Sequence, residues 1–280
     1  MASPRISQGA EGEAVFLPQG GNTGTVGGAT PPPDGSALIL SLRRMNRVRA
    51  INAAAGFAVA EAGVILANFH EAMASADKRF PLTLGAKGSA TIGGLVSTNA
   101  GGNQVLRHGT MRAQVLGLEA VLADGSVFSA LTPLKKDNRG FDLKQLLIGS
   151  EGTLGIVTAA TLRLMPAIAE RLVIWAGVPS LHIARTLLLH CEQAMGDALE
   201  GFEVVPHASL ERVLAFLPAA RAPLQQDHAW HVLIEVVADK AGAADLGARG
   251  EAMLASAFEA GLVEDAAISA SEAQAEAFWL

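Results

Sequence analysis

The first part of the chain alternates short apolar runs with turns that are rich in glycine. Apolar runs of roughly four to eight residues that end at turn residues are typical of strands packed in a core. We predict strands here at residues 14–17, 37–42, 48–52, 57–61, 115–123, 126–131 and 156–165. Two of them flank Asp124-Gly125, which favours the tight turn of a hairpin. Apolar side chains at helical spacing predict a helix at residues 64–76, and further helices are predicted at residues 91–99 and 142–148. Free N–H groups at the start of the helix at residues 91–99 are expected to suit an anion such as a pyrophosphate.

After Pro166 the pattern changes to strands that alternate with longer amphipathic helices. We predict strands at residues 172–176, 199–205 and 230–237, and helices at residues 181–195, 209–216 and 242–261. Ser271 and Gln274 have the spacing of a capping box, which predicts the start of a further helix. Such alternation favours a sheet covered by helices. We therefore divide the chain into a leader at residues 1–13, a domain at 14–166 and a second domain at 167–280.

Composition narrows the classes of partner. Of the 280 residues, 50% are hydrophobic, and the net charge is −6. Nucleic-acid binding needs clustered Lys and Arg, and the one basic group, at residues 43–49, is expected to face solvent. Cys191 is the only cysteine, so no internal disulfide can form, and we expect it in a helix core. No apolar run is long enough to cross a membrane and residues 1–13 lack a signal-peptide core, so we predict a cytoplasmic protein.

The stretch from Pro18 to Gly28 carries five glycines in eleven residues, between the first two predicted strands. Glycine allows a positive φ and lets a ligand approach the backbone, so successive N–H groups can converge on an anion such as a phosphate. A flexible surface turn is the alternative interpretation. Two further glycine-rich stretches, at residues 84–102 and 148–157, favour a binding site.

These stretches do not have the spacing of the common nucleotide motifs. No Gly-x-Gly-x-x-Gly follows a strand, and no Gly-x4-Gly-Lys-Ser/Thr occurs, so neither a Rossmann site nor a P-loop is indicated. Three separated glycine loops suit a long, bent ligand, of which FAD is an example.

The loops, together with residues 98–102, 107–112, 115–119 and 136–146, resemble the FAD-binding domain of flavin-linked oxidases and dehydrogenases of the vanillyl-alcohol-oxidase type. The similarity is greatest to the D-2-hydroxyglutarate and D-lactate dehydrogenases, and covers residues 14–166. It implies an α+β fold, with a two-subdomain FAD-binding domain of the PCMH type and a partial ferredoxin-like α/β cap domain.

The resemblance also implies a set of cofactor residues. Gly20 to Gly24 would hold the pyrophosphate, and Asn22 stands where relatives with covalent flavin carry histidine, so FAD is expected to be non-covalent. The flavin and ribityl chain would contact Gly85, Ser89, Ile92, Gly93, Gly94, Thr98 and Asn99, and the adenine end Glu151, Gly155, Ile156 and Val157. The set is completed by Gln19, Gly20, Gly21, Asn22, Thr23, Gly24, Gly27, Gly28, Gly101 and Gly109. His108 replaces a tyrosine common in relatives, and either a flavin contact or a tolerated substitution explains it.

The implied reaction is oxidation of a small anionic D-2-hydroxy acid, with hydride transfer to flavin N5 and an electron acceptor other than oxygen. Relatives bind the substrate through an arginine and through zinc or another divalent metal. The residues that do so belong to their C-terminal half, and nothing in this chain matches those residues. Catalytic residues therefore stay unassigned. His228 and His231 open a predicted strand three residues apart, so they should face opposite sides and form no metal pair. Lys135 and Lys136 could meet an anionic substrate, although a solvated loop is favoured.

Both ends of the chain differ from the family pattern. A strand and helix normally precede the first glycine loop, and the final predicted helix stops at the apolar residues 278–280, so we expect a truncated chain. Such a chain should bind FAD without enzyme-like turnover of D-2-hydroxyglutarate or D-lactate. The alternatives are a non-catalytic FAD-binding module and a cell-wall reductase of the same fold, for which no catalytic serine region is found. The oligomeric state stays open, with a homodimer as one possibility.

Overall fold

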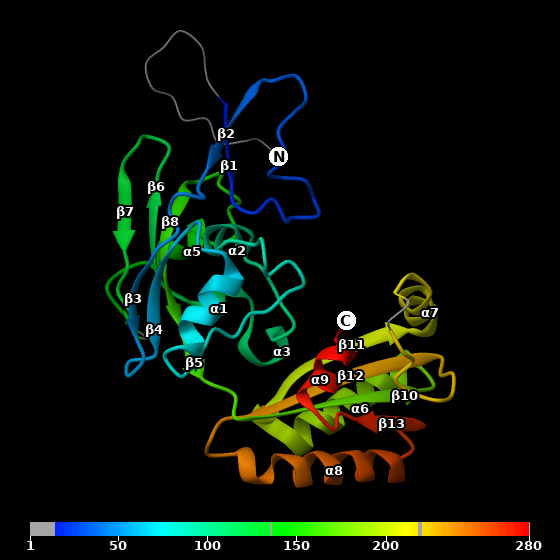
Figure 1. The fold of residues 1–280 in the computed structure, drawn as a ribbon. Helices are drawn as coiled ribbons and strands as arrows, with labels where there is room; N and C mark the ends of the chain where they lie inside the picture. The colour runs from blue at the N-terminus through cyan, green and yellow to red at the C-terminus, as the bar shows by residue number, and fades with distance from the viewer. Residues whose placement is uncertain (1–14, 135, 218–219, 280) are drawn as a thin grey trace. The chain divides into compact units, whose positions relative to one another are not determined.

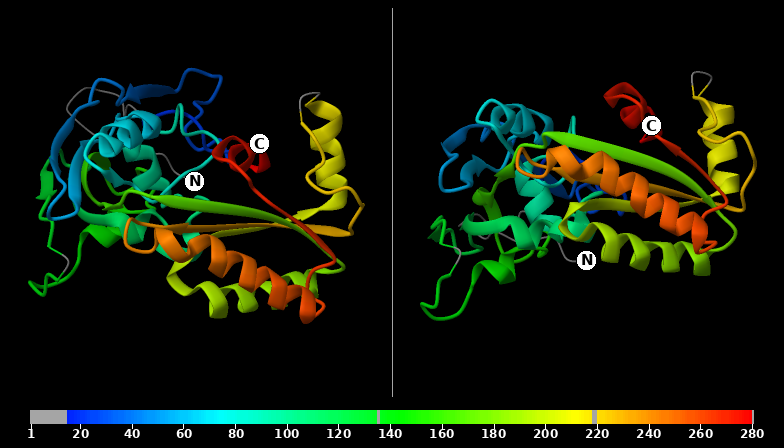
Figure 2. Two further views of the ribbon diagram at one scale, coloured as in Figure 1. Left: turned by 60° about the horizontal axis from the view of Figure 1, so that its bottom comes forward. Right: turned by 90° about the horizontal axis from the view of Figure 1, so that it is seen from below.

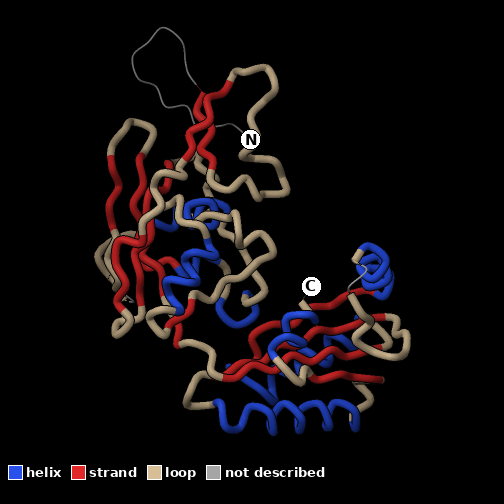
Figure 3. Tube along the Cα trace, viewed as in Figure 1, coloured by secondary structure: helices blue, strands red, loops and turns tan. Residues whose placement is uncertain are grey.

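The computed structural model describes residues 15–134, 136–217 and 220–279 (Figure 1). The predicted leader and Lys135 lie outside the described residues. The chain divides into two compact units. Unit 1 comprises Met1–Gly102 and His108–Ala167, and unit 2 comprises Asn103–Arg107 and Ile168–Leu280. Helices and sheets occur in both units, which confirms the predicted α+β class (Figure 3).

An antiparallel five-stranded sheet, in the order β3-β4-β8-β6-β7, forms the framework of unit 1. Its strands are β3 (Val48–Asn52), β4 (Phe57–Glu61), β6 (Val115–Val121), β7 (Val127–Ala130) and β8 (Ile156–Arg163). The central strand β8 is buried along most of its length. The predicted hairpin of β6 and β7 is confirmed. Two smaller sheets pair β1 (Val15–Gln19) with β2 (Ala37–Ser41) in parallel, and β5 (Lys78–Arg79) with β9 (Met165–Pro166) in antiparallel orientation.

Short helices pack around this sheet. They are α1 (Leu66–Ala74), α2 (Ile92–Thr98), α4 (Met111–Gln114) and α5 (Lys144–Leu147). The short helix α3 (Val105–His108) lies at the boundary in sequence between the two units. Helix α1 buries Leu66, Phe69 and Met73 in the core of unit 1. Helix α2 contributes Ile92, Leu95 and Val96 to the same core. The core therefore fixes α2, which the functional site below uses.

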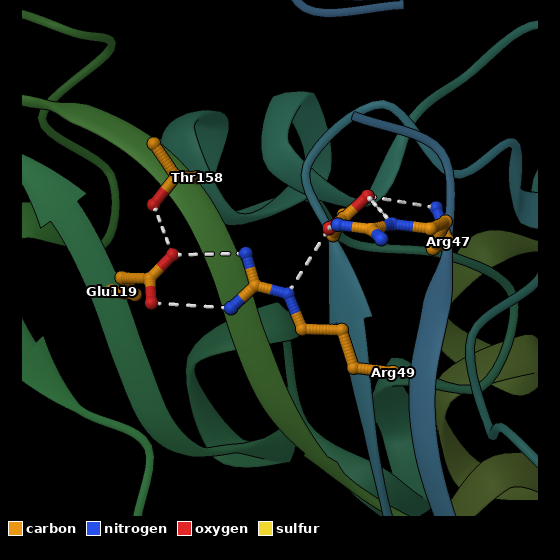
Figure 4. A network of polar contacts seen from close by, with 5 residues as sticks. Arg47, Arg49, Glu119 and Thr158 are labelled. Atoms are coloured by element: carbon orange, nitrogen blue, oxygen red, sulfur yellow. Dashed lines mark hydrogen bonds and ion pairs between the residues drawn. The ribbon is translucent and has the colours of Figure 1, made fainter. Parts of the chain in front are cut away.

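Two arginines of the basic group at residues 43–49 bind carboxylates of the sheet, although Arg47 itself stays 79% exposed. Arg47 and Arg49 both donate to the carboxylate of Glu61 on β4, and Arg49 also binds Glu119 on β6 (Figure 4). Thr158 on β8 donates to Glu119 at 2.7 Å. The network connects strands across the sheet. It also supplies the charged or N–H partners that a buried carboxylate such as Glu61 requires.

Unit 2 contains a four-stranded antiparallel sheet in the order β11-β12-β10-β13. The strands are β10 (Glu170–Val178), β11 (Leu199–Pro206), β12 (Trp230–Ala238) and β13 (Asp265–Ile268). Helix α6 (Leu181–Met195) connects β10 with β11, and α8 (Ala243–Glu259) connects β12 with β13. This is the ferredoxin-like arrangement, with the additional helix α7 (His207–Phe216) between β11 and β12. This arrangement agrees with the ferredoxin-like α/β fold expected for this part of the chain.

The two faces of this sheet bury different helices. Ile174, Val232 and Ile234 pack with α6 and α8, whereas Trp175 and Leu233 pack with α7 and α9 (Glu272–Phe278). Figure 2 shows α6 and α8 together on one face. Ser271 caps α9 by accepting from the amide of Gln274, which confirms the predicted helix start, while the Gln274 side chain accepts from the amide of Ala270. Among the described residues, no helix combines the length and apolarity needed to cross a membrane.

Candidate cofactor site

Unit 1 contains a hollow of about 530 Å³ beside the first glycine loop. The loop after β1 forms one wall, α2 and the residues after it form a second, and Glu151, Gly152, Ile156 and Val157 form a third. A hollow of several hundred Å³ is of the size that small-molecule and cofactor sites usually have. The three glycine-rich stretches of the sequence therefore converge on one site.

The glycine loop offers backbone donors to this hollow. Among the described residues, none of the amides from Asn22 to Val26 donates a hydrogen bond. Asn22 adopts a positive φ of 52° and Gly27 one of 72°. Unbonded amides in a loop with such left-handed residues can turn toward an anion. A Cβ on Gly24 would meet no atom within 4 Å, so this position faces open space.

The same loop is packed tightly against the start of α2. A Cβ on Gly21 would overlap the carbonyl oxygen of Ser89, and a Cβ on Gly20 would overlap the hydroxyl of Thr91. Glycine is required at both positions for this close approach. Glycines of one loop thus have two different roles, since Gly20 and Gly21 allow packing whereas Gly24 leaves space for a ligand.

The amino end of α2 does not offer the free N–H groups that the sequence analysis expected. The amide of Ile92 donates to Val64 O at 2.9 Å, and the amide of Gly93 donates to Ala62 O at 2.7 Å. The amide of Gly94 donates to the side chain of Thr91, which caps the helix. These bonds use the first amides of the helix, so an anion would find its donors in the glycine loop.

Most of the predicted cofactor residues line the hollow. They are Gln19, Gly20, Gly21, Asn22, Thr23, Gly24, Gly28, Gly93, Gly94, Thr98, Asn99, Gly101, Glu151, Ile156 and Val157. The carboxylate of Glu151 lies 3.6 Å from the position of a Cβ on Gly28. The glycine loop and the wall that contains Glu151 therefore approach each other at this point.

Six predicted residues lie outside the lining, namely Gly27, Gly85, Ser89, Ile92, Gly109 and Gly155. Ile92 is a fully buried core residue, and Ser89 packs its carbonyl against Gly21. Gly109 has a φ of 73° in the turn before α4, and Gly155 packs against Val121 and Leu147. These residues shape the chain around the hollow instead of facing it.

The structure also adds lining residues that the sequence analysis did not select, including Leu42, Leu84, Thr91 and Ser97. Thr91 could have been found, because a threonine directly before an apolar helix is a common N-cap. Leu42 and Leu84 carry no local signal of this kind.

Other candidate groups lie elsewhere. Arg79 Nη2 donates to His108 Nε2 at 3.4 Å, and His108 is not among the residues that line the hollow. His228 and His231 do not face apart as expected, because their ring centroids are 6.0 Å apart. His228 precedes β12, so the strand alternation does not extend to it. No group of three potential metal ligands occurs within the described part of the chain.

Comparison with known proteins agrees with this geometry. Residues 8–130 match the family model of the FAD binding domain. The chain is 41% identical over 264 residues to a mitochondrial D-2-hydroxyglutarate dehydrogenase of Bos taurus. The aligned region covers 94% of this chain and 47% of that protein. The corresponding protein of Arabidopsis thaliana is 39% identical over 267 residues, or 95% of the chain and 47% of that protein.

Solved structures of alkyldihydroxyacetonephosphate synthase share the fold. One of them is 17% identical and has a TM-score of 0.70 over 94% of this chain and 49% of that one. The chain thus spans about half the length of the curated relatives it matches.

The predicted cytoplasmic location is wrong, because the dehydrogenases of Bos taurus and Arabidopsis thaliana are named as mitochondrial proteins.

Proposed function

We propose that the chain supplies the FAD-binding part of a D-2-hydroxy-acid dehydrogenase that acts on D-2-hydroxyglutarate or D-lactate. The observation that carries the proposal is the hollow of unit 1, in which three glycine-rich stretches meet. Two of these stretches lie within the segment that matches the FAD binding domain model. The identity of about 40% to D-2-hydroxyglutarate dehydrogenases supports the substrate class.

The residues of the hollow fit FAD. Unbonded amides at residues 22–26 suit the pyrophosphate, since a phosphate needs several N–H donors. Thr23, Thr98 and Asn99 provide hydroxyl and amide groups for the ribityl chain or the ribose. Ile156 and Val157 provide apolar surface for a planar ring. Among the described residues of the lining there is no histidine, cysteine or tyrosine, which supports non-covalent binding.

Oxidation of a 2-hydroxy acid to the 2-oxo acid removes a hydride from Cα and a proton from the hydroxyl group. Bound FAD would supply the two-electron acceptor for this step. The glycine loop and the wall at residues 151–157 bind and orient the cofactor in this proposal, and electrons pass on to an acceptor other than oxygen. A hydroxy acid must be held against the cofactor in a fixed pose for the transfer to be fast.

The test is a titration of the purified chain with FAD, followed by an assay with D-2-hydroxyglutarate or D-lactate and an artificial electron acceptor. Flavin that is bound at equilibrium and released into the supernatant by acid supports non-covalent binding. Turnover would support the dehydrogenase over a non-catalytic FAD-binding module, whereas FAD binding without turnover is also expected of a chain that spans about half the length of its relatives. Absence of FAD binding would overturn the proposed function.

A further inference from the structure

Two walls of the hollow are connected by backbone hydrogen bonds. The amide of Glu151 donates to Ser97 O at 2.8 Å, and the amide of Gly149 donates to Val96 O at 3.1 Å. Ser97 and Glu151 both line the hollow. The position of the segment at residues 149–152 therefore depends on the carboxyl end of α2.

Arg112 on α4 contacts both of these segments from outside the lining. Its backbone amide donates to Asn99 Oδ1 at 2.9 Å, and Asn99 lines the hollow as the left-handed C-cap of α2. Its guanidinium donates to Gln145 O at 2.8 Å, to Gln145 Oε1 at 2.7 Å and to Ile148 O at 2.5 Å. One residue thus bridges the end of α2 and the end of α5.

The guanidinium also covers the turn that follows α5. Gly149 has a φ of 80°, and a Cβ at this position would lie 3.3 Å from both Arg112 Nη2 and Asn99 Cβ. Within the described part of the chain, Arg112 forms no ion pair with a carboxylate. The N–H groups of Arg112 donate to neutral oxygens. The planar guanidinium therefore fixes the orientation of the segments it binds and does not neutralise a charge.

We propose that Arg112 is a positioning residue of the cofactor site, which holds residues 97–101 against residues 149–152 so that both face FAD. The inference rests on the proposed function of the hollow. Arg112 itself need not touch the cofactor, because Asn99 and Glu151 present the surfaces that do. Lysine has one point charge in place of the fork and can satisfy only part of this set of acceptors.

The experiment compares Arg112→Met and Arg112→Lys with Arg49→Met as the matched control. Arg49 also donates several hydrogen bonds within unit 1, but its partners Glu61 and Glu119 do not line the hollow. For each variant we measure the thermal midpoint without FAD, the Kd for FAD by flavin fluorescence, and the visible circular dichroism of bound flavin. The last signal reports the surroundings of the flavin and is not changed by a loss of stability alone.

We expect Arg112→Met to weaken FAD binding by about tenfold or more relative to Arg49→Met, a difference of about 1.4 kcal/mol, and to alter the visible circular dichroism. Arg112→Lys should fall between wild type and Arg112→Met, and it carries the comparison if Arg112→Met does not fold. Equal FAD affinity and equal spectra in the Arg112 and Arg49 variants would overturn the positioning role while leaving the proposed function intact. A wild-type chain that binds no FAD would overturn both.

Discussion

The carboxylate of Glu61 lies 2.9 Å from the guanidinium of Arg47, and the two side chains have opposite environments. Glu61 is 3% exposed, whereas Arg47 is 79% exposed. The hydrogen bonds from Arg47 lower the pKa of Glu61 to about 2. The buried end of this pair adjoins Ala62, whose carbonyl receives the amide of Gly93 in α2.

We predict that Glu61→Gln lowers the free energy of unfolding by on the order of 2 kcal/mol, because neutral glutamine cannot match the charged partners. The loss stays at this size because the exposed Arg47 is partly screened by solvent. The matched control is Asp137→Asn, whose carboxylate pairs with Arg139 at the surface. Urea unfolding of both variants at neutral pH measures the difference. Equal stability of the two variants would contradict a structural role for the buried pair.

The same pair predicts a loss of stability in acid. The folded pKa of about 2 lies below the ordinary value of 4.5, so the stabilisation is present above pH 4.5 and is lost as the pH falls toward 2. Wild type should therefore lose its advantage over Glu61→Gln between these values. An advantage that stays constant down to pH 2 would argue against the assignment.

Two alanine substitutions in the glycine loop should have different effects. Gly21→Ala should destabilise the chain without FAD, because its Cβ would overlap the carbonyl of Ser89. Gly24→Ala should leave that stability unchanged, because its Cβ meets no protein atom, and should weaken FAD binding by about tenfold by occupying the hollow. Thermal unfolding without FAD and a fluorescence titration separate the two effects. Unchanged FAD affinity in Gly24→Ala would remove this residue from the site.

The buried His231 predicts a second pH effect, in unit 2. Burial, and then the neighbouring His207 and His228, lower the pKa of His231 to about 4, while Asp227 acts in the opposite direction. Trp175 Nε1 donates to His231 Nδ1 at 3.1 Å, and His231 Nε2 lies 3.2 Å from His207 Nδ1. His228 in turn contacts Glu264 at 2.9 Å, and His207 has Glu211 and Asp227 within 4 Å.

The sign of this effect follows from the lowered pKa. The unfolded chain binds the proton more readily, so the stabilisation is complete above pH 6.5 and declines as the pH falls toward 4. His231→Gln should reduce the slope of stability against pH in this range, whereas substitution of the exposed His182 by glutamine should not. Urea unfolding between pH 4 and 7 tests the prediction, and identical slopes in the two variants would refute it.

Cys191 should be inert in the folded protein. It is fully buried on α6, its thiol contacts Met253 Sδ at 3.6 Å, and burial raises its pKa to about 12. A thiol with so little thiolate reacts slowly. We expect negligible reaction with a disulfide reagent under native conditions and one reactive thiol per chain in denaturant. Rapid native labelling would show that α6 opens readily.

The sequence alone determined those features that depend on neighbours along the chain. Apolar periodicity located α6 with its observed bounds, alternating runs located β3 and β4, and Asp124-Gly125 marked the β6–β7 turn. The glycine spacing also indicated the ligand class, because backbone approach is encoded locally by the absence of Cβ. Strand β13 was missed, because its four residues, Asp265–Ile268, pair along one edge of the sheet and carry little apolar periodicity.

Tertiary structure decided which of these groups meet and which are already satisfied. The amides of Ile92 and Gly93 were expected to be free, but they bond to carbonyls from the distant segment at residues 62–64. His228 and His231 approach each other because the strand begins after His228. Arg112 acquired its contacts only when α2 and α5 were brought together. Hydrogen-bond partners that are far apart in sequence leave no periodic signal, so only the folded chain reveals them.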